Sequence, residues 1–238
     1  MKAAMFYLSF LNPVSFLVCI LIAPELYGDN RTRVKLGFAF EPELNRTFGA
    51  SVGFSGFGSL TLNTRFAMKG EGGISLGTTG TAYDIKTFAK AEMGFPFRVP
   101  LSASFHYIYN GLPAYKTHIQ SLIPMVSLNG RWAGFSIGPA WHFTAFNREE
   151  LIVESVLAFS GYVNFYNTGK ARIGLQCANI TNFVSRNMGA YSLKLYSQAD
   201  IIRGCSLINE ITLYQSGSVG LAAVFYGAAY RGGIIFTW

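Results

Sequence analysis

Serine, histidine and glutamate side chains offer the first chemistry that this sequence could perform. The chain has three histidines, His106, His118 and His142, and none has the H-x-x-x-H spacing of a metal site. Ser104 precedes His106 by two residues, and Glu154 follows His142 beyond a predicted turn, so either pair could serve hydrolysis. The sequence contains no G-x-S-x-G or P-loop motif. Because neighbouring serine, histidine and glutamate positions of this kind also arise by chance, we expect no enzyme activity, no cofactor and no metal.

Charges on one face of a predicted strand offer a second kind of chemistry, the selection of ions. Residues 83–95 alternate apolar positions with charged or polar ones, which is the two-residue period of a β-strand. Four charges share one face, and they are Asp84, Lys86, Lys90 and Glu92. A soluble sandwich with a dry core does not accommodate such a strand, whereas a barrel with lipid outside and a polar lumen does.

The same parity argument assigns further charges to the lumen. The predicted lumen-facing charged residues are Arg33, Lys35, Glu41, Arg65, Asp84, Lys86, Lys90, Glu92, Glu154, Lys170, Arg172, Lys194, Glu210 and Arg231. Nine of them are basic and five are acidic, and rings of charge in a pore select ions by sign. The residues expected to set the selectivity are Arg65, Lys86, Lys90, Lys170 and Arg172, with Asp84 and Glu92 partly neutralising the lysine pair. We therefore expect a mild preference for anions.

The composition favours strands in a membrane. Half of the residues are hydrophobic and 13% are charged, against roughly 25% charged in ordinary soluble domains. After residue 28 no apolar run reaches ~18 residues, the length that a spanning helix needs. The net charge of +7 is scattered along the chain, so nucleic acid is not an expected partner. Cys177 and Cys205 share the parity of apolar neighbours and are expected as small buried hydrophobes, with a disulfide left open.

The positions of the alternating segments predict the architecture. Alternation runs from Val34 to Trp238 and predicts an all-β, transmembrane antiparallel barrel of about 12 strands, with about 10 to 14 allowed, since bacterial barrels have even strand numbers. Turn chemistry and glycine predict connections or loops at 42–46, 70–80, 129–130, 147–149, 167–169 and 227–228. Prolines predict bulges or edges at Pro96, Pro100 and Pro124. A soluble lipocalin-like barrel is the alternative, but the aromatic residues are too many for one small lumen.

The segment 218–238 resembles the closing strand of bacterial outer-membrane β-barrels. Tyr230, Ile234, Phe236 and Trp238 share one parity, and the aromatic Trp238 is the last residue. In that family the last strand carries the signature read by the barrel assembly machinery. The resemblance implies a porin-like barrel in the bacterial outer membrane, with lipid and that machinery as partners.

The beginning of the chain predicts export. Residues 1–28 have one early lysine and an uncharged apolar core, as a signal peptide does, so 29–238 is expected to form the barrel. Cleavage after Ala23 or Gly28 stays open, and a retained anchor is the alternative. Lipidation of Cys19 is not expected, because Val18 precedes it where a small residue is needed.

A second resemblance concerns the stretch 174–180. Its sequence GLQCANI is similar to a G-L-x-x-x-N-[IL] strand of barrels in the long-chain fatty-acid transporter family, although this chain is shorter and has no room for that family's hatch. The predicted function is passive permeation of small polar solutes through a basic lumen. The alternatives are a hydrophobic-substrate barrel, a plugged structural or adhesive barrel and an outer-membrane enzyme. The sequence identifies neither the solute nor the oligomeric state.

Overall fold

The computed structural model describes most of the chain beyond the predicted signal. The described residues are 33–45, 49–62, 66–79, 82–96, 101–112, 116–146, 150–180, 190–216 and 224–238. For 45, 62, 66, 78–79, 82–92, 94–96, 112, 146, 150 and 216 the description is limited to the backbone. The predicted signal peptide at 1–28, Arg65 and Pro100 lie outside the described residues. Within the described ranges no helix is long and apolar enough to cross a membrane.

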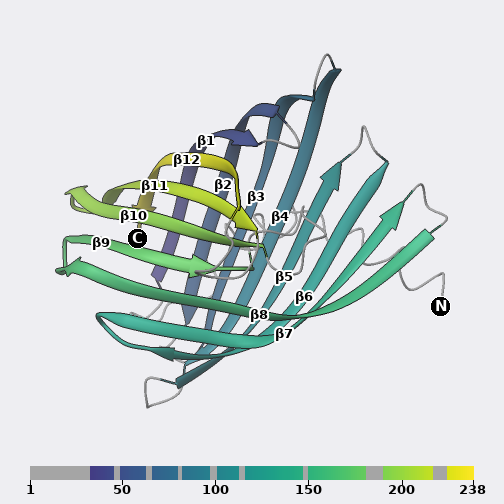
Figure 1. Cartoon of the computed structure of the whole chain (residues 1–238). Coiled ribbons are helices and arrows are strands. Elements are labelled where there is room, and N and C mark those ends of the chain that lie inside the picture. Colours follow the sequence, from purple (N-terminus) through teal and green to yellow (C-terminus); the bar gives the residue numbers. More distant parts are fainter. Residues whose placement is uncertain are drawn as a thin grey trace.

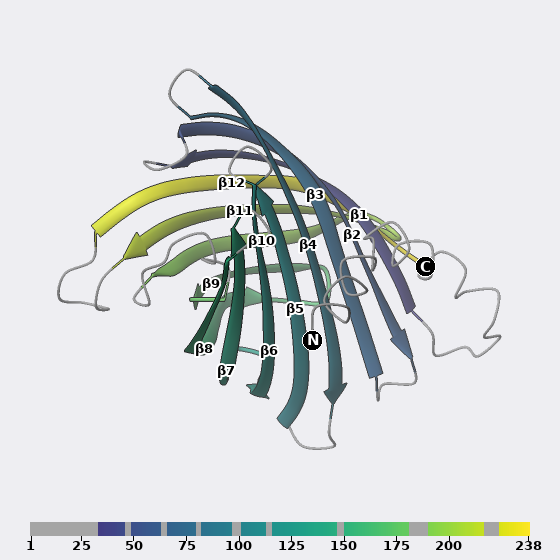
Figure 2. The same ribbon diagram turned by 90° about the vertical axis from the view of Figure 1, so that its right-hand side faces the viewer.

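Twelve strands follow one another around a closed, wholly antiparallel barrel. Their bounds are β1 Arg33–Asn45, β2 Gly49–Leu62, β3 Phe66–Thr79, β4 Ala82–Pro96, β5 Leu101–Leu112, β6 Thr117–Asn129, β7 Ala133–Phe146, β8 Glu150–Asn167, β9 Ala171–Ala178, β10 Tyr191–Ile202, β11 Cys205–Ser216 and β12 Val224–Thr237. Figure 1 shows β12 beside β1, where the barrel closes, and the register pairs Leu36 with Phe236 and Phe38 with Ile234. Figure 2 shows the long strands β5 to β8 next to one another. The predicted all-β barrel of 12 strands is confirmed.

The barrel wall exposes apolar side chains on its outer face and buries polar side chains inside, which is the reverse of a soluble protein. Large apolar side chains are exposed, among them Phe38 at 68%, Leu44 at 64% and Leu157 at 62%. Fully or nearly fully buried positions on the other face include Ser121 at 0% and Ser55 at 5%. An exposed apolar belt around a polar interior suits lipid contact, because a strand in a barrel alternates between lipid and lumen.

The two ends of the barrel differ in their connections. β1 begins and β12 ends at the same end, which we call the terminal end. The strands connect there through 63–65, 97–100, 130–132, 168–170 and 203–204. The strand ends separated by the longest stretches of sequence, those of β9 and β10 and those of β11 and β12, lie at the opposite end. In outer-membrane barrels the shorter turns face the periplasm and the longer loops face outward.

Three predicted turns lie inside strands, and those predictions are wrong. The stretch 70–79 belongs to β3, where Gly70 and Gly72 pair with Gly58 and Gly56 of β2. Pairing on both sides supplies the backbone hydrogen bonds, so the weak strand preference of glycine is overridden. Residues 42–45 likewise continue β1. Gly227 and Ala228 are interior positions of β12, paired with both β11 and β1.

The prolines interrupt hydrogen bonding without shifting the register. Pro124 lies in the middle of β6, and the ladder to β7 is interrupted between Leu122 and Val126, yet the pairing resumes in the same register. A bulge predicted at Pro124 is therefore wrong, because proline only removes a donor. Pro96 ends β4 as predicted. Pro42 lies where the ladder between β1 and β12 is interrupted. The extra residues of the register shifts lie in β8, β10 and β12 instead.

The two cysteines differ from expectation. Cys177 on β9 and Cys205 on β11 are free thiols of intermediate exposure. They are not fully buried, because neighbouring Leu175 and Leu207 are exposed on the outer face and the cysteines share their parity. β10 separates their strands.

Candidate lumen site

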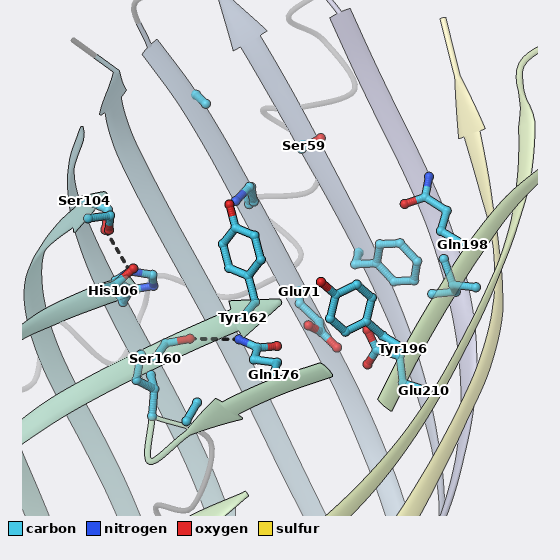
Figure 3. A pocket seen from close by; sticks show the side chains of 18 of the residues that line it. Ser59, Glu71, Ser104, His106, Ser160, Tyr162, Gln176, Tyr196, Gln198 and Glu210 are labelled. Carbon is cyan, nitrogen blue, oxygen red and sulfur yellow. Dashed lines mark hydrogen bonds between the residues drawn. The ribbon is translucent and has the colours of Figure 1, made fainter. Parts of the chain in front are cut away.

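The interior of the barrel contains a cavity of about 770 Å³. Among the residues with described side chains, eleven strands contribute to its lining, which is rich in hydroxyl groups. The lining serines are Ser59, Ser102, Ser104, Ser127, Ser136, Ser160 and Ser197. Figure 3 shows Tyr162, Gln176, Tyr196 and Glu210 around this space. A hydroxyl-lined cavity of this size can hold water and small polar solutes.

Three interior aromatic rings lie over glycines on the next strand. Tyr162 covers Gly134 and donates its hydroxyl to the Gly130 carbonyl at 2.8 Å. Tyr196 covers Gly174 and donates to Asn164 Oδ1 at 2.6 Å. In both cases a Cβ on the glycine would collide with the ring. Such ring-over-glycine packing supports a bent sheet, and it lays the rings along the wall, so the bulk of Tyr162 does not block the lumen.

Phe57 makes the third such pair and adds a charge contact. Its ring lies over Gly37, with no room for a Cβ there. The Arg231 guanidinium lies 4.8 Å from the centre of the same ring. An arginine over an aromatic face gains a cation–π attraction. Phe57 therefore links the wall to the charged residues of the lumen.

Arg231 lies at the centre of an ion-pair cluster, which we call the Arg231 cluster. Its Nη2 is 2.9 Å from Glu71, its Nε 3.1 Å from Glu41 and its Nη1 3.9 Å from Glu210. Lys194 Nζ contacts the same Glu210 at 3.0 Å. The side chains are only 16–26% exposed. Buried charges need such partners, since an unpaired one costs several kcal/mol. The cluster joins β1, β3, β10, β11 and β12 and leaves its two cations neutralised.

Two other lumen cations have no such partner. Lys35 on β1 and Arg172 on β9 line the cavity, and within the described part of the chain neither makes an ion pair. Arg172 instead lies 5.3 Å from the ring centre of Tyr196. These two side chains therefore carry charge that a dissolved anion can meet.

The residues predicted to set selectivity occupy different places. Arg172 lines the cavity, whereas Lys170 is exposed in the turn between β8 and β9. The backbone of β4 places Lys86 opposite Ser75 and Lys90 opposite Glu71 of β3. The side chains of Asp84, Lys86, Lys90 and Glu92, like all of Arg65, are outside the described part. Their role in selectivity stays a prediction.

Sequence reasoning missed part of this lining. Glu71 lines the cavity from β3, where a glycine-rich loop was expected, and Lys69, which immediately precedes that predicted loop, lines it as well. The ring-over-glycine pairs were also missed, because each partner lies on a different strand and only the register brings them together. The positions of Tyr162 and Tyr196 on the lumen-facing side of the alternation indicated that they point inward, but not that they lie over glycines.

The serine–histidine pairs form hydrogen bonds. Ser104 Oγ and His106 Nε2 are 2.9 Å apart on the cavity wall. Ser121 Oγ and His142 Nδ1 are 2.8 Å apart, and Glu154 lies opposite His142 in the register. Ser121 is 0% exposed, so a substrate does not reach it. Ser104 is accessible, but the ladders on both sides of β5 use the backbone amides of the strand around it, so these amides are not free to stabilise an oxyanion.

The predicted assembly residues lie on the outer face of β12. Tyr230, Ile234, Phe236 and Trp238 are 40–67% exposed. Tyr230 donates to Asn209 Oδ1 at 2.7 Å, which explains a polar residue in the apolar phase of β11. Their recognition by the assembly machinery stays a prediction.

Asn179, from the stretch that resembles fatty-acid transporters, ends the pairing of β9. Its Oδ1 accepts from the Phe159 amide at 2.7 Å, and its Nδ2 donates to the Leu157 carbonyl at 2.7 Å. The side chain thus replaces one rung of the ladder to β8. This role is structural and needs no hydrophobic substrate.

Comparison with solved structures gives the wider context of this barrel. The translocator domain of the autotransporter NalP from Neisseria meningitidis is similar over 99% of this chain and 99% of that one, with a TM-score of 0.54 and 10% identity. The NanC porin is similar over 84% of this chain and 98% of its own, with a TM-score of 0.55 and 11% identity. This chain folds as an outer-membrane β-barrel. The predicted recognition and outer-membrane location are confirmed at the level of the fold.

The porin similarity extends to a second solved structure. The KdgM porin in complex with disordered oligogalacturonate is similar over 85% of this chain and 99% of its own, with a TM-score of 0.52 and 8% identity. No family model matches the sequence of this barrel. No curated protein matches it either.

Proposed function

We propose that this outer-membrane β-barrel is a passive diffusion channel for small polar solutes with a mild preference for anions. The observation that carries the proposal is the charge of the cavity lining. Its charged residues are Lys35, Lys69, Glu71, Arg172, Glu210 and Arg231. Four are basic and two acidic, and the two that make no ion pair with any described residue, Lys35 and Arg172, are both basic. A pore with such a lining attracts anions.

The barrel's partners follow from the same proposal. The exposed apolar belt on the outer face suits outer-membrane lipid. The outward row that ends at Trp238 suits the assembly machinery. The size and hydroxyl content of the cavity suit small hydrophilic solutes, in keeping with the porins among the similar folds.

The test is a conductance measurement on the refolded protein in a planar bilayer. We expect single-channel steps, and in a salt gradient a reversal potential of modest anion preference that grows at low salt, where the Debye length exceeds its ~8 Å at physiological ionic strength. Lys35→Gln combined with Arg172→Gln should move the reversal potential toward zero. Lys170→Gln, in an exposed turn, removes one charge away from the cavity and is the control.

The predicted lysine pair of β4 allows a second test of selectivity in the same conductance measurement. Changing Lys86 and Lys90 to Glu should move the reversal potential toward cation selectivity, because two residues of one parity, ~13 Å apart along a strand, point the same way. An unchanged potential in conducting channels would place both lysines outside the selective part of the lumen.

The competing functions make different predictions. A plugged or structural barrel would give no conductance steps. An enzyme built on Ser104 and His106 would be labelled by a fluorophosphonate, and the label would disappear in Ser104→Ala. We expect no labelling, because the amides beside Ser104 are used in the ladders.

A further inference from the structure

The lumen walls of β8, β9 and β10 bring together ring faces, amides and an arginine that makes no ion pair with any described residue. Tyr162, Arg172, Gln176, Tyr196 and Gln198 all line the cavity. Figure 3 shows Tyr162 with Gln176 and Tyr196 with Gln198 on this side of the space. We call these five residues the tyrosine–arginine wall. From this geometry we propose that it is a binding site for a ring-shaped hydroxylated carboxylate, an acidic sugar, which rests on the proposed channel function and names its solute class.

The arginine supplies the recognition of the carboxylate. Arg172 pairs in the register with Asn167 on one side and Gln198 on the other. Its guanidinium lies against the ring of Tyr196, which holds the planar group along the wall. A guanidinium held in this way can bind a carboxylate through two parallel hydrogen bonds. Arg231 cannot take this role, because three carboxylates of its cluster already surround it.

Tyr162 supplies the surface for the sugar ring, whereas the Tyr196 ring is covered by Gly174 and by the Arg172 guanidinium and serves to position that group. Both tyrosines are tied by their hydroxyls to the wall, Tyr162 to Gly130 and Tyr196 to Asn164. The rings therefore cannot swing freely across the lumen. An aromatic ring fixed along a wall offers an apolar surface to the C–H side of a sugar ring, at low cost in side-chain entropy.

The amides and serines match the remaining hydroxyl groups. Gln176 donates through Nε2 to Ser160 Oγ at 2.9 Å, which orients its carbonyl oxygen as an acceptor. Gln198 and Ser197 line the cavity beside Tyr196. Amides and hydroxyls both donate and accept hydrogen bonds, as a polyhydroxylated ligand requires.

Nearby acids do not oppose a carboxylate here. Glu210 lies opposite Tyr196 in the register, but Lys194 holds it at 3.0 Å. Asp200 is exposed and lies two residues beyond Gln198 on β10, toward the terminal end. Its carboxylate accepts a hydrogen bond from Ser206 Oγ at 2.6 Å. The unpaired charge on the wall itself is that of Arg172.

The test is calorimetric titration of the folded barrel in detergent with three probes. Glucuronate has the ring and the carboxylate, glucose lacks the carboxylate, and gluconate lacks the ring. We expect glucuronate to bind about tenfold more tightly than either of the others. Its dissociation constant should still be weak, in the millimolar range, because a solute that permeates must also leave. Equal binding of glucuronate and gluconate would overturn the role of the Tyr162 ring.

Variants locate the site. Arg172→Gln should weaken glucuronate binding about tenfold, whereas Lys35→Gln, which removes an equal charge from the same cavity, should change it less than about twofold. Tyr162→Leu should lower the affinity for glucuronate to near that for gluconate. Arg172→Lys keeps the positive charge but lacks the planar guanidinium, so its affinity for glucuronate should lie between those of Arg172→Gln and the unchanged protein. Folding of each variant is checked by gel migration before heating. Equal losses in Arg172→Gln and Lys35→Gln would overturn the site in favour of a general charge effect.

The same protein in a planar bilayer separates this inference from the channel itself. Conductance steps without glucuronate binding would remove the sugar site and keep the channel. Binding of glucuronate without any conductance would keep the site and remove the channel. Binding together with a reversible block of the current by glucuronate, lost in Arg172→Gln, is the expected result.

Discussion

Single residues in this barrel differ most in whether their charge is already satisfied. Arg231 and Lys194 have carboxylate partners within 3.1 Å, whereas Arg172 has a tyrosine ring. Alternation alone placed all three residues in one lumen-facing set. A two-residue period predicts which face of a strand a side chain is on, but it does not predict which charged residue will pair with it. The structural and the solute-facing cations therefore become distinct only in three dimensions.

Removal of the central cation should destabilise the barrel. Arg231→Gln removes one ion-pair partner from both Glu41 and Glu71, and breaking a buried pair on one side costs about 3–5 kcal/mol at full burial. Because the side chains are 16–26% exposed, we expect about 2 kcal/mol, seen as a lower urea midpoint for loss of the folded gel band. Lys170→Gln, in an exposed turn, should leave the midpoint unchanged. A urea midpoint for Arg231→Gln equal to that of the unchanged protein would contradict the structural role of the cluster.

Strands set the limits of what the sequence could predict. Alternation located most of the wall, and the twelve strands and their antiparallel order agree with it. It failed at the glycines of β3 and at Gly227, because local preference indicates a turn and only pairing on both sides makes these positions strand. The glycines beneath Tyr162 and Tyr196 were unpredictable for a related reason, since the register between strands is a long-range property.

One such pair can be tested directly. In Gly174→Val the new side chain would collide with the Tyr196 ring and with the Val163 carbonyl. We expect the ring to leave the wall, with a lower single-channel conductance and a loss of stability of about 1–3 kcal/mol from overpacking. Gly169→Val is the control, because a Cβ there meets nothing within 4 Å. Unchanged conductance and stability in Gly174→Val would contradict this account of the wall.

The outward end of β12 should serve assembly more than permeation. Deletion of 236–238 removes the Phe236–Trp238 ring contact and the backbone bonds between Trp238 and Val34. We expect the amount of protein in the outer membrane to drop sharply, as measured by immunoblotting of membrane fractions. Thr237→Ala, which changes an inward neighbour, should insert normally. Full insertion of the deleted chain would argue against a recognition signature here.

The whole molecule has its apolar surface outside and its polar surface inside, so its stability depends on a membrane or detergent. We expect the unboiled protein to migrate differently from the boiled protein on SDS gels, because a closed barrel resists the detergent until it is heated. Circular dichroism in detergent should be that of a β protein. A helical spectrum, or full solubility without detergent, would be incompatible with this barrel.

The interruption of the ladder between β1 and β12 bears on how the barrel forms. Around Glu41 and Pro42 the first and last strands lack the backbone pairing found on either side, and Arg231 with its carboxylates spans the interruption. These strands are the most distant in sequence, so their contact has the highest contact order and forms late. Closure then requires Arg231 to shed its water just as it meets Glu41 and Glu71. We expect the desolvation of this one side chain to add to the barrier of the closing step, and we expect the closed ring to open first along the same pair of strands.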